Sequence, residues 1–257
     1  MKRIFSHHRV IALISLAVVL VVWEIAARPM NPILVTYPTA IAREFVSEIA
    51  DGTIISAFLS TMQPMVVGFL IAVIVGIPVG LLVGRYRGVE AAIGFYITGG
   101  YAMPMVALTP LFILWFGLGF TVKVAIVTVM TIFPVVISTW SGVLAVPKSL
   151  VEVGTSFVAS QGAIMRKIIL PATIPSIMTG LRLGIGRAVI GVVIAEFFTA
   201  LSGLGGAIIL AGQRFDTAAL FVPVVILMAL GIGLTSLVGY FERKVAPWNR
   251  SLSGSRR

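Results

Sequence analysis

Residues 151–171 read VEVGTSFVASQGAIMRKIILP, and they separate two long apolar runs of the chain. Polar and charged residues alternate with apolar ones along this stretch, which is typical of an amphipathic segment and not of a membrane span. The whole connection of roughly 30 residues is longer than two neighbouring spans require. We therefore expect a structured element outside the bilayer that ends at Leu170-Pro171, with Pro175 as a second helix breaker.

The composition of the chain is that of a membrane protein. Of its 257 residues, 59% are hydrophobic and only 11% are charged, and the mean hydropathy is +1.10. A soluble domain carries about 25% charged residues, and runs of about 20 apolar residues are long enough to cross a bilayer as helices. The sequence therefore predicts an all-α integral membrane protein with six transmembrane helices and no separate soluble catalytic domain.

Six apolar runs define the order of the predicted spans. We expect a retained first span with the N-terminus inside, followed by a short interfacial helix at residues 39–49 on the outer surface. The predicted spans cover residues 10–27, 55–84, 91–116, 122–143, 177–200 and 219–240. The third run contains Gly99-Gly100, Pro104 and Pro110, which are expected to break it.

The basic residues are distributed unevenly over these segments. Thirteen of the nineteen Lys and Arg residues fall in segments predicted to be inner, and four fall in segments predicted to be outer. The four outer residues are Arg28, Arg43, Lys123 and Arg214. Cytoplasmic loops carry the excess of Lys and Arg, so both termini and residues 151–171 are expected in the cytoplasm. The net charge of +10 is then explained by topology and by contact with anionic lipid, and not by binding of nucleic acid.

Two charged residues of the fifth predicted span are candidates for a translocation path. Arg187 lies deeper in the span than Arg182, which can extend its side chain to the inner surface. Arg187 and Glu196 are nine residues apart, too far for a direct pair on one helix. Arg187 therefore requires another partner, such as a helix end, a lipid phosphate or a transported anion. For Arg187 and Glu196 alike, a role in the path stands beside the alternative of structural pairing between helices.

Other chemistries find no support in the sequence. The glycine-rich segment 202–206 follows a membrane helix and lacks the Lys-Ser/Thr ending of a phosphate-binding loop, so we expect a flexible outer loop or a gate there. No Walker sequence and no catalytic His-Glu-x-x-His or Gly-x-Ser-x-Gly motif is present. Any ATPase must therefore be another chain. The chain has no cysteine, and its two histidines, His7 and His8, stand far from other metal ligands, so no metal site is expected.

The spacing within residues 152–171 resembles the EAA motif of permease subunits of ATP-binding-cassette importers. That motif runs Glu-Ala-Ala, three residues, Gly, nine residues, Ile, one residue and Leu-Pro. Here it falls on Glu152, Val153, Gly154, Val158, Ile168, Leu170 and Pro171. Val158 stands in place of the motif's glycine, so Gly154 or Gly162 is expected to supply the bend, because glycine takes positive φ at no steric cost.

The resemblance implies that short transverse helices of this loop dock in a groove of a cytoplasmic ATPase. Glu152 would make a polar contact at the groove, and Leu170-Pro171 would set the turn back into the membrane. The expected ATPase-coupling residues are Glu152, Gly154, Val158, Ala159, Ser160, Ile168, Leu170 and Pro171.

Further stretches resemble the importer permeases of the nitrate, sulfonate, taurine and bicarbonate group. They are residues 110–117 (PLFILWFG), 133–134 (FP), 171–182 (PATIPSIMTGLR) and 191–196 (GVVIAE). The resemblance implies a single permease domain over residues 1–257. In it, residues 1–54 hold the first span and the outer helix, residues 55–245 form the core, and residues 150–171 form the coupling loop.

The same resemblance implies the partners. They are a second copy of the permease in a bacterial inner-membrane homodimer, two cytoplasmic ATP-binding subunits and an extracytoplasmic solute-binding protein. ATP and Mg would be bound by the ATPase, so this chain would bind no cofactor.

The expected function is the membrane-spanning path of an ATP-driven importer. Group membership and Arg187 favour a small oxyanion such as a sulfonate, nitrate, taurine or bicarbonate. The alternative is a permease of the same fold for a neutral or heteroaromatic nutrient, such as a pyrimidine or a vitamin precursor. A secondary carrier would work without an ATPase, which the motif spacing disfavours, and a scaffold subunit would have no path of its own.

Overall fold

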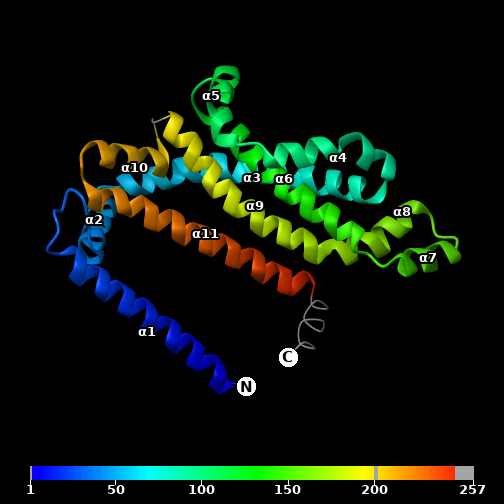
Figure 1. Cartoon of the computed structure of the whole chain (residues 1–257), viewed down its shortest axis with the longest axis horizontal. Coiled ribbons are helices and arrows are strands. Elements are labelled where there is room, and N and C mark those ends of the chain that lie inside the picture. Colours follow the sequence, from blue (N-terminus) through cyan, green and yellow to red (C-terminus); the bar gives the residue numbers. More distant parts are fainter. Residues whose placement is uncertain (1, 200–201, 247–257) are drawn as a thin grey trace.

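The computed structural model describes residues 2–199 and 202–246 of the chain, with side chains from residue 10 onward. Every secondary-structure element in that part of the chain is a helix. In chain order they are α1 (Lys2–Ala27), α2 (Pro38–Ala50), α3 (Thr53–Arg85), α4 (Arg87–Ala102), α5 (Met105–Phe116), α6 (Phe120–Leu144), α7 (Lys148–Ser156), α8 (Gln161–Ile164), the π-helical turn η1 (Met165–Ile169), α9 (Leu170–Thr199), α10 (Gly203–Gln213) and α11 (Thr217–Val245). Figure 1 shows α7 and α8 at one end of the longest axis, and α2 with the α10–α11 turn at the other.

The all-helical fold class predicted from the sequence is confirmed. Five helices are long and apolar enough to cross a membrane, and the bent pair of α4 and α5 gives a sixth candidate. The predicted spans 10–27, 55–84, 122–143 and 219–240 lie within α1, α3, α6 and α11, and the short helix predicted at residues 39–49 lies within α2.

The core of the molecule is the packed set of α3, α6 and α9. α6 packs extensively against both of the others, and Figure 1 shows the three helices running together. On α3, Gly80 faces α6 so closely that an added Cβ would lie 2.6 Å from Cβ of Thr139 and 2.7 Å from the carbonyl oxygen of Val136. Small residues at such contacts let apolar helices pack where lipid offers little hydrophobic driving force.

The third predicted span is two helices instead of one. α4 and α5 are bent by 102° relative to each other, and the break falls at Met103-Pro104. The expected break at Pro104 is thus confirmed. The expected breaks at Gly99-Gly100 and Pro110 are wrong, because the two glycines lie inside α4 and Pro110 lies inside α5. At Pro110 the fixed φ suits the helix, and only one backbone hydrogen bond is lost.

The fifth span begins earlier than predicted. The chain is helical without interruption from Gln161 to Thr199, so the expected ends at Pro171 and Pro175 are wrong. At Pro171 the reason lies in η1, where the backbone N–H of Leu170 donates to the carbonyl of Met165. This wider turn directly precedes Pro171, whose ring would crowd the carbonyl of a regular α-helical turn.

A helix that the sequence did not predict follows the fifth span. Residues expected to form a flexible outer loop are the buried first turn of α10, with Gly203, Leu204 and Gly205 all enclosed. After α10, Phe215 takes a positive φ of 57° and reverses the chain into α11.

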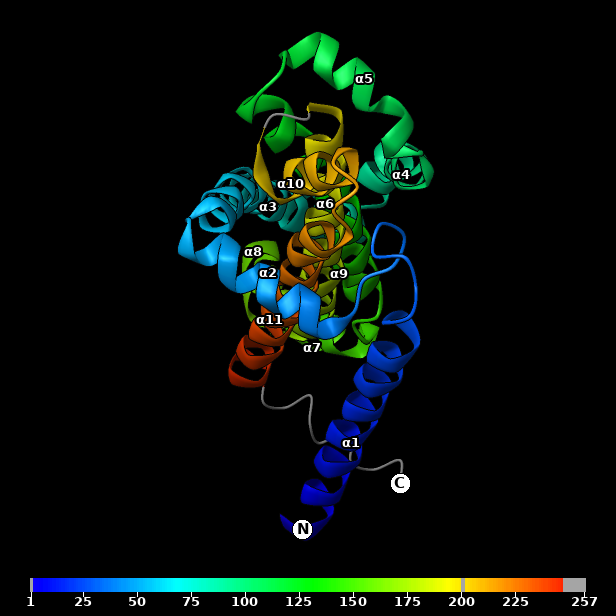
Figure 2. The same cartoon turned by 90° about the vertical axis from the view of Figure 1, so that its left-hand side faces the viewer.

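Helix α1 stands apart from the rest of the molecule along most of its length, as Figure 2 shows, and only 6% of its residues 10–27 are buried. Its contacts are at its C-terminal end. The indole Nε1 of Trp23 donates to the carbonyl of Thr36 at 2.9 Å. The carboxylate of Glu24 accepts from the backbone N–H and the hydroxyl of Thr39 at 3.0 and 2.6 Å, which fastens α2 to α1.

Candidate functional site

The stretch predicted to couple to an ATPase folds into a helical hairpin at one end of the molecule (Figure 1). One arm is α7 and the other is α8 with η1. The arms meet at Gly154, where an added Cβ would lie 2.8 Å from Cδ1 of Ile168 and 3.2 Å from Cγ1 of Ile164. Gly154 is therefore a packing position between the arms and not the bend of the hairpin.

The bend lies at Val158. This residue has a positive φ of 54°, a conformation that costs a residue other than glycine about 1–2 kcal/mol. The expectation that Gly154 or Gly162 supplies the bend is wrong, because neither has a positive φ. The turn is closed by hydrogen bonds from the backbone N–H of Val158 to the carbonyl of Thr155 at 2.8 Å and from that of Ala159 to the carbonyl of Gly154 at 3.1 Å.

The tip of the hairpin is apolar and exposed. The side chain of Val158 is 91% exposed and that of Phe157 is 83% exposed. Directly after the tip, the hydroxyl of Ser160 accepts from the backbone N–H of Ala163 at 3.3 Å and so caps α8. The bend and the cap together hold two apolar side chains outward in a defined direction.

Polar residues line the root of the hairpin. Glu152 is exposed and borders a hollow of about 350 Å³ together with Arg85 and Lys148, and it forms no ion pair with any described residue. The guanidinium of Arg85 donates to the side-chain oxygen of Gln161 at 2.6 Å and ties α3 to the second arm. The predicted residues Ile168, Leu170 and Pro171 are half-buried where this arm joins α9.

Arg187 lies on an exposed face of α9, between the exposed residues Leu183 and Ile190. Its guanidinium lies 5.8 Å from the ring centroid of Tyr101, which stands just before the break between α4 and α5. No carboxylate among the described residues forms an ion pair with it. Arg182, one turn earlier, instead pairs with Glu242 of α11.

Glu196 is fully buried and lies away from Arg187, among α3, α6 and α10. Its carboxylate accepts from the hydroxyl of Thr61 at 2.9 Å and from the backbone N–H of Gly205 at 2.8 Å. The ammonium of Lys123 lies 3.5 Å from the same carboxylate and also donates to the hydroxyl of Ser202 at 3.0 Å. This geometry corresponds to pairing between helices, which is one of the two alternatives that the sequence left open.

Sequence reasoning missed the partners of Glu196. Lys123 was counted as an outer loop charge, whereas only 4% of it is exposed. One signal was available, because Lys123 stands inside an apolar run next to Val122, where an isolated lysine needs a partner. Thr61 offered no such signal, since threonine is common in membrane helices.

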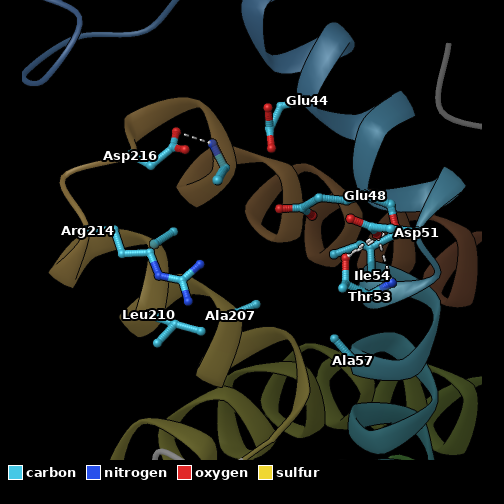
Figure 3. A pocket seen from close by; sticks show the side chains of 12 residues that line it. Glu44, Glu48, Asp51, Thr53, Ile54, Ala57, Ala207, Leu210, Arg214 and Asp216 are labelled. Atoms are coloured by element: carbon cyan, nitrogen blue, oxygen red, sulfur yellow. Dashed lines mark hydrogen bonds between the residues drawn. The ribbon is translucent and has the colours of Figure 1, made fainter.

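The opposite end of the molecule holds a hollow of about 260 Å³ among α2, α3, α10 and α11. Figure 3 shows the carboxyl groups of Glu44 and Glu48 turned toward the open space that faces Arg214. Burial, and then the charges of Glu44, Asp51 and Asp216, raise the pKa of Glu48. The hollow is lined by the carboxyl groups of Glu44, Glu48, Asp51 and Asp216 and by the guanidinium of Arg214. Within residues 2–199 and 202–246, no group of three or more His, Cys, Asp or Glu residues could hold a metal ion.

The helical bundle and the hairpin that it carries together define the class, a helical membrane-transport subunit. The chain belongs to the family of binding-protein-dependent transport system inner membrane components, whose family model matches residues 76–247. It is therefore a multi-pass permease subunit of an ABC importer and not an enzyme, and the subunits of this family bind no cofactor. The family implies two kinds of partner, an ATPase and a binding protein.

Relatives of known name extend this likeness over nearly the whole chain. The formylaminopyrimidine transport permease protein ThiX of Halalkalibacterium halodurans is 29% identical over 90% of this chain and 92% of its own length. The putative aliphatic sulfonates transport permease protein SsuC of Bacillus subtilis is 30% identical over 93% of this chain and 87% of its own length.

A solved structure supports the fold. The chain superposes on the inward-facing MetNI methionine ABC transporter with a TM-score of 0.66 and 19% identity, over 77% of this chain and 98% of that chain. At this level of identity the likeness concerns the fold alone.

Substitution of Val158 by glycine tests the strain at the hairpin tip. Release from the left-handed conformation gains about 1–2 kcal/mol, and the extra freedom of glycine in the unfolded chain offsets about 0.5–1 kcal/mol of this. We expect Val158→Gly to raise the free energy of unfolding by up to about 1.5 kcal/mol, measured as a higher midpoint of thermal unfolding in detergent. The matched variant Val153→Gly, in an ordinary helical conformation on α7, is expected to lower it by about 0.5–1 kcal/mol. Equal destabilisation by both variants would contradict a strained turn.

Proposed function

We propose that the chain is one protomer of a homodimeric, ATP-driven importer for a small oxyanion, in which residues 150–171 couple the membrane helices to the ATPase. The whole chain then forms one permease domain with its core at residues 55–245. The observation that carries this proposal is the exposed tip Phe157-Val158, held on a hairpin whose second arm continues without a break into α9. Exposed apolar side chains on a structured protrusion indicate contact with another protein.

The proposed orientation places the hairpin in the cytoplasm of a bacterial cell. Lys148, Arg166 and Lys167 are exposed on the hairpin, whereas the hollow at the opposite end is lined by four carboxyl groups and one guanidinium. Cytoplasmic segments of membrane proteins carry the excess of basic residues. With six spans, both termini then lie on the cytoplasmic side, and the acidic hollow lies on the side from which the binding protein delivers its cargo.

The proposed path runs along the face of α9 that carries Arg187. Leu183, Gly186 and Ile190 share the exposed side of α9 with Arg187. A second copy of the chain against this face would enclose Arg187 between the two protomers. A guanidinium within a membrane span is stable where it faces a protein interior or a water-filled path, and a shared path at the dimer axis meets this condition.

A small oxyanion suits the chemistry of this path. The planar guanidinium of Arg187 can donate two parallel hydrogen bonds to a sulfonate, nitrate or carboxylate group, and Tyr101 beside it restricts its orientation. A neutral heteroaromatic nutrient is the second candidate, because the half-exposed ring of Tyr101 could stack with a base. The names of the relatives include both kinds of substrate, so the cargo requires a direct test.

The first prediction concerns orientation. The chain has no cysteine, so Phe157→Cys and Phe215→Cys each introduce a single reactive thiol at an exposed position. With the permease expressed without its ATPase, a membrane-impermeant maleimide should label Phe157→Cys in inverted vesicles only and Phe215→Cys in right-side-out spheroplasts only. Labelling of Phe157→Cys from the outer side would overturn the proposed orientation.

The second prediction concerns coupling. Loss of a charged contact at a protein interface costs about 1.5–3 kcal/mol, which corresponds to about tenfold or more in affinity. We therefore expect Glu152→Ala to lower ATP-dependent uptake about tenfold in proteoliposomes with the ATPase and binding protein, while ATP hydrolysis continues. Glu90→Ala, which removes the same charge from α4 near that end of the molecule, serves as the control and should leave uptake unchanged. Uptake that runs on an ion gradient without ATPase would instead support a secondary carrier.

The third prediction concerns the cargo. Removal of the positive charge in Arg187→Gln should lower the maximal rate of sulfonate uptake about tenfold, the effect of losing one charge-assisted hydrogen bond. Arg187→Lys keeps the charge and should retain most of the rate. If Arg187→Gln transports the cargo at the wild-type rate, an anion path at this residue is excluded, and uptake of a pyrimidine by both variants would favour the neutral nutrient.

A further inference from the structure

We propose that Glu196 is a positioning residue that fastens α10 to α9, so that the two helices move as one body during the transport cycle. The proposal rests on the proposed function, because it assigns Glu196 a part in the movement that ATP drives. Its role is distinct from that of Arg187, because Glu196 faces the interior of the chain and not the exposed side of α9.

The carboxylate of Glu196 caps the first turn of α10. It accepts from the backbone N–H of Gly205 at 2.8 Å. The hydroxyl of Thr61 donates to the carboxylate at 2.9 Å and accepts from the backbone N–H of Leu204 at 2.8 Å. Two of the N–H groups that lack a partner inside α10 are thus satisfied by α9 and α3. A negative charge at this position is also favoured by the dipole of α10.

The glycines of α10 leave the space that this carboxylate occupies. An added Cβ at Gly203 would overlap the carboxylate of Glu196, and one at Gly205 would lie 2.8 Å from Cβ of Glu196. Gly203 also has a positive φ of 89°. The glycine-rich segment is therefore the receptor for the Glu196 side chain and not a flexible loop.

Lys123 of α6 completes the environment of the carboxylate. Its ammonium lies 3.5 Å from Oε1 of Glu196 and donates to the hydroxyl of Ser202 at 3.0 Å and to the carbonyl of Ser202 at 3.4 Å. If α10 parted from α9, the fully buried carboxylate of Glu196 would lose a backbone donor, and the backbone N–H of Gly205 would lose its acceptor. Because buried charges and N–H groups without partners are strongly disfavoured, the contact favours joint movement of the two helices.

The contact between Glu196 and α10 would pass movement of the hairpin on to α10. The helix from Gln161 to Thr199 has 39 residues, which at about 1.5 Å per residue is roughly 58 Å long. One end follows the tip at Val158, and Glu196 lies near the other. Through α10, movement of this helix would be passed to the turn at Phe215, the other described residue besides Val158 that is not glycine and has a positive φ. The side chain of Phe215 is 71% exposed, so movement of this turn would change the surface of the molecule.

The test is a distance measured between α9 and α10 in the complete transporter. Spin labels are placed at Phe198→Cys and Leu210→Cys, both exposed positions, in a chain that has no native cysteine. Labelled protomers are diluted into unlabelled ones so that only distances within one protomer are recorded. In nanodiscs with the ATPase and binding protein, we expect one narrow distance distribution that is the same without nucleotide and with ATP trapped. A distribution that changes between the two states overturns the proposal.

Three variants distinguish a role of Glu196 in holding α10 from a role in the stability of the fold alone. Glu196→Ala should broaden the distribution and lower uptake about tenfold while ATP hydrolysis continues, as expected for loss of a charged hydrogen bond. Thr61→Val keeps the side-chain volume and should have the same effects to a smaller degree, so it decides the matter if Glu196→Ala fails to fold. Thr139→Val is the control, because the buried hydroxyl of Thr139 bonds only within its own helix. Unchanged distances and uptake in both Glu196→Ala and Thr61→Val would overturn the proposal.

Failure of the proposed function would look different. In that case wild-type proteoliposomes would show no ATP-driven uptake, whatever the distances. The comparison of the wild type with Thr61→Val would still decide whether Glu196 holds α10. A transporter that takes up its cargo normally while α9 and α10 separate would refute the fastening alone.

Discussion

The unbroken helix from Gln161 to Thr199 is the constraint on which the rest of the structure depends. In apolar surroundings, a helix that is interrupted leaves backbone N–H and C=O groups without partners. Pro171 and Pro175 each lack a backbone N–H and so favour such an interruption. The π-helical turn at Met165–Ile169 widens the helix before the first of them. The result is one element that begins in a polar hairpin and ends beside a buried carboxylate. This continuous element connects the hairpin directly to the far end of the span.

The two ends of this element are organised by opposite physical means. At the hairpin tip, Val158 accepts an unfavourable backbone conformation, and this turns two apolar side chains toward solvent. Strain of this kind persists only where the surrounding structure enforces it, here the contact of Gly154 with Ile168 and the cap formed by Ser160. At the other end, Glu196 is buried, and its partners come from three other helices. Under the proposed function, the first end meets a partner, whereas the second holds helices of this chain together.

These features fit the way in which an importer uses ATP. ATP can shift the permease between conformations only to the extent that the ATPase binds it better in one of them. The permease therefore has to present a defined surface to the ATPase and to resist bending between that surface and the far side of the membrane. The extensive packing of α6 against α3 and α9 joins these three helices into one core. Under the proposed function, the choice of cargo depends on Arg187 and on the binding protein that delivers the cargo.

The sequence by itself determined the membrane character and the positions of most spans, and it predicted the amphipathic hairpin to which we assign coupling. These follow from hydropathy, charge bias and residue spacing, which are local properties of the chain. Prediction from the sequence was wrong where contacts between residues far apart in the chain overrode a local preference. The glycine-rich segment after the fifth span had the composition of a loop, yet it forms α10 because Glu196 and Thr61 satisfy its first N–H groups.

Only the tertiary structure decided which polar groups meet. Lys123 and Glu196 are 73 residues apart, and Thr61 and Glu196 are 135 residues apart, so no spacing rule connects them. The backbone of Val158 likewise takes a conformation that its own side chain disfavours, because the two arms of the hairpin dictate where the chain must turn. Patterning along the chain specifies helices that can cross a membrane, whereas the partners of a buried charge are specified by how those helices pack.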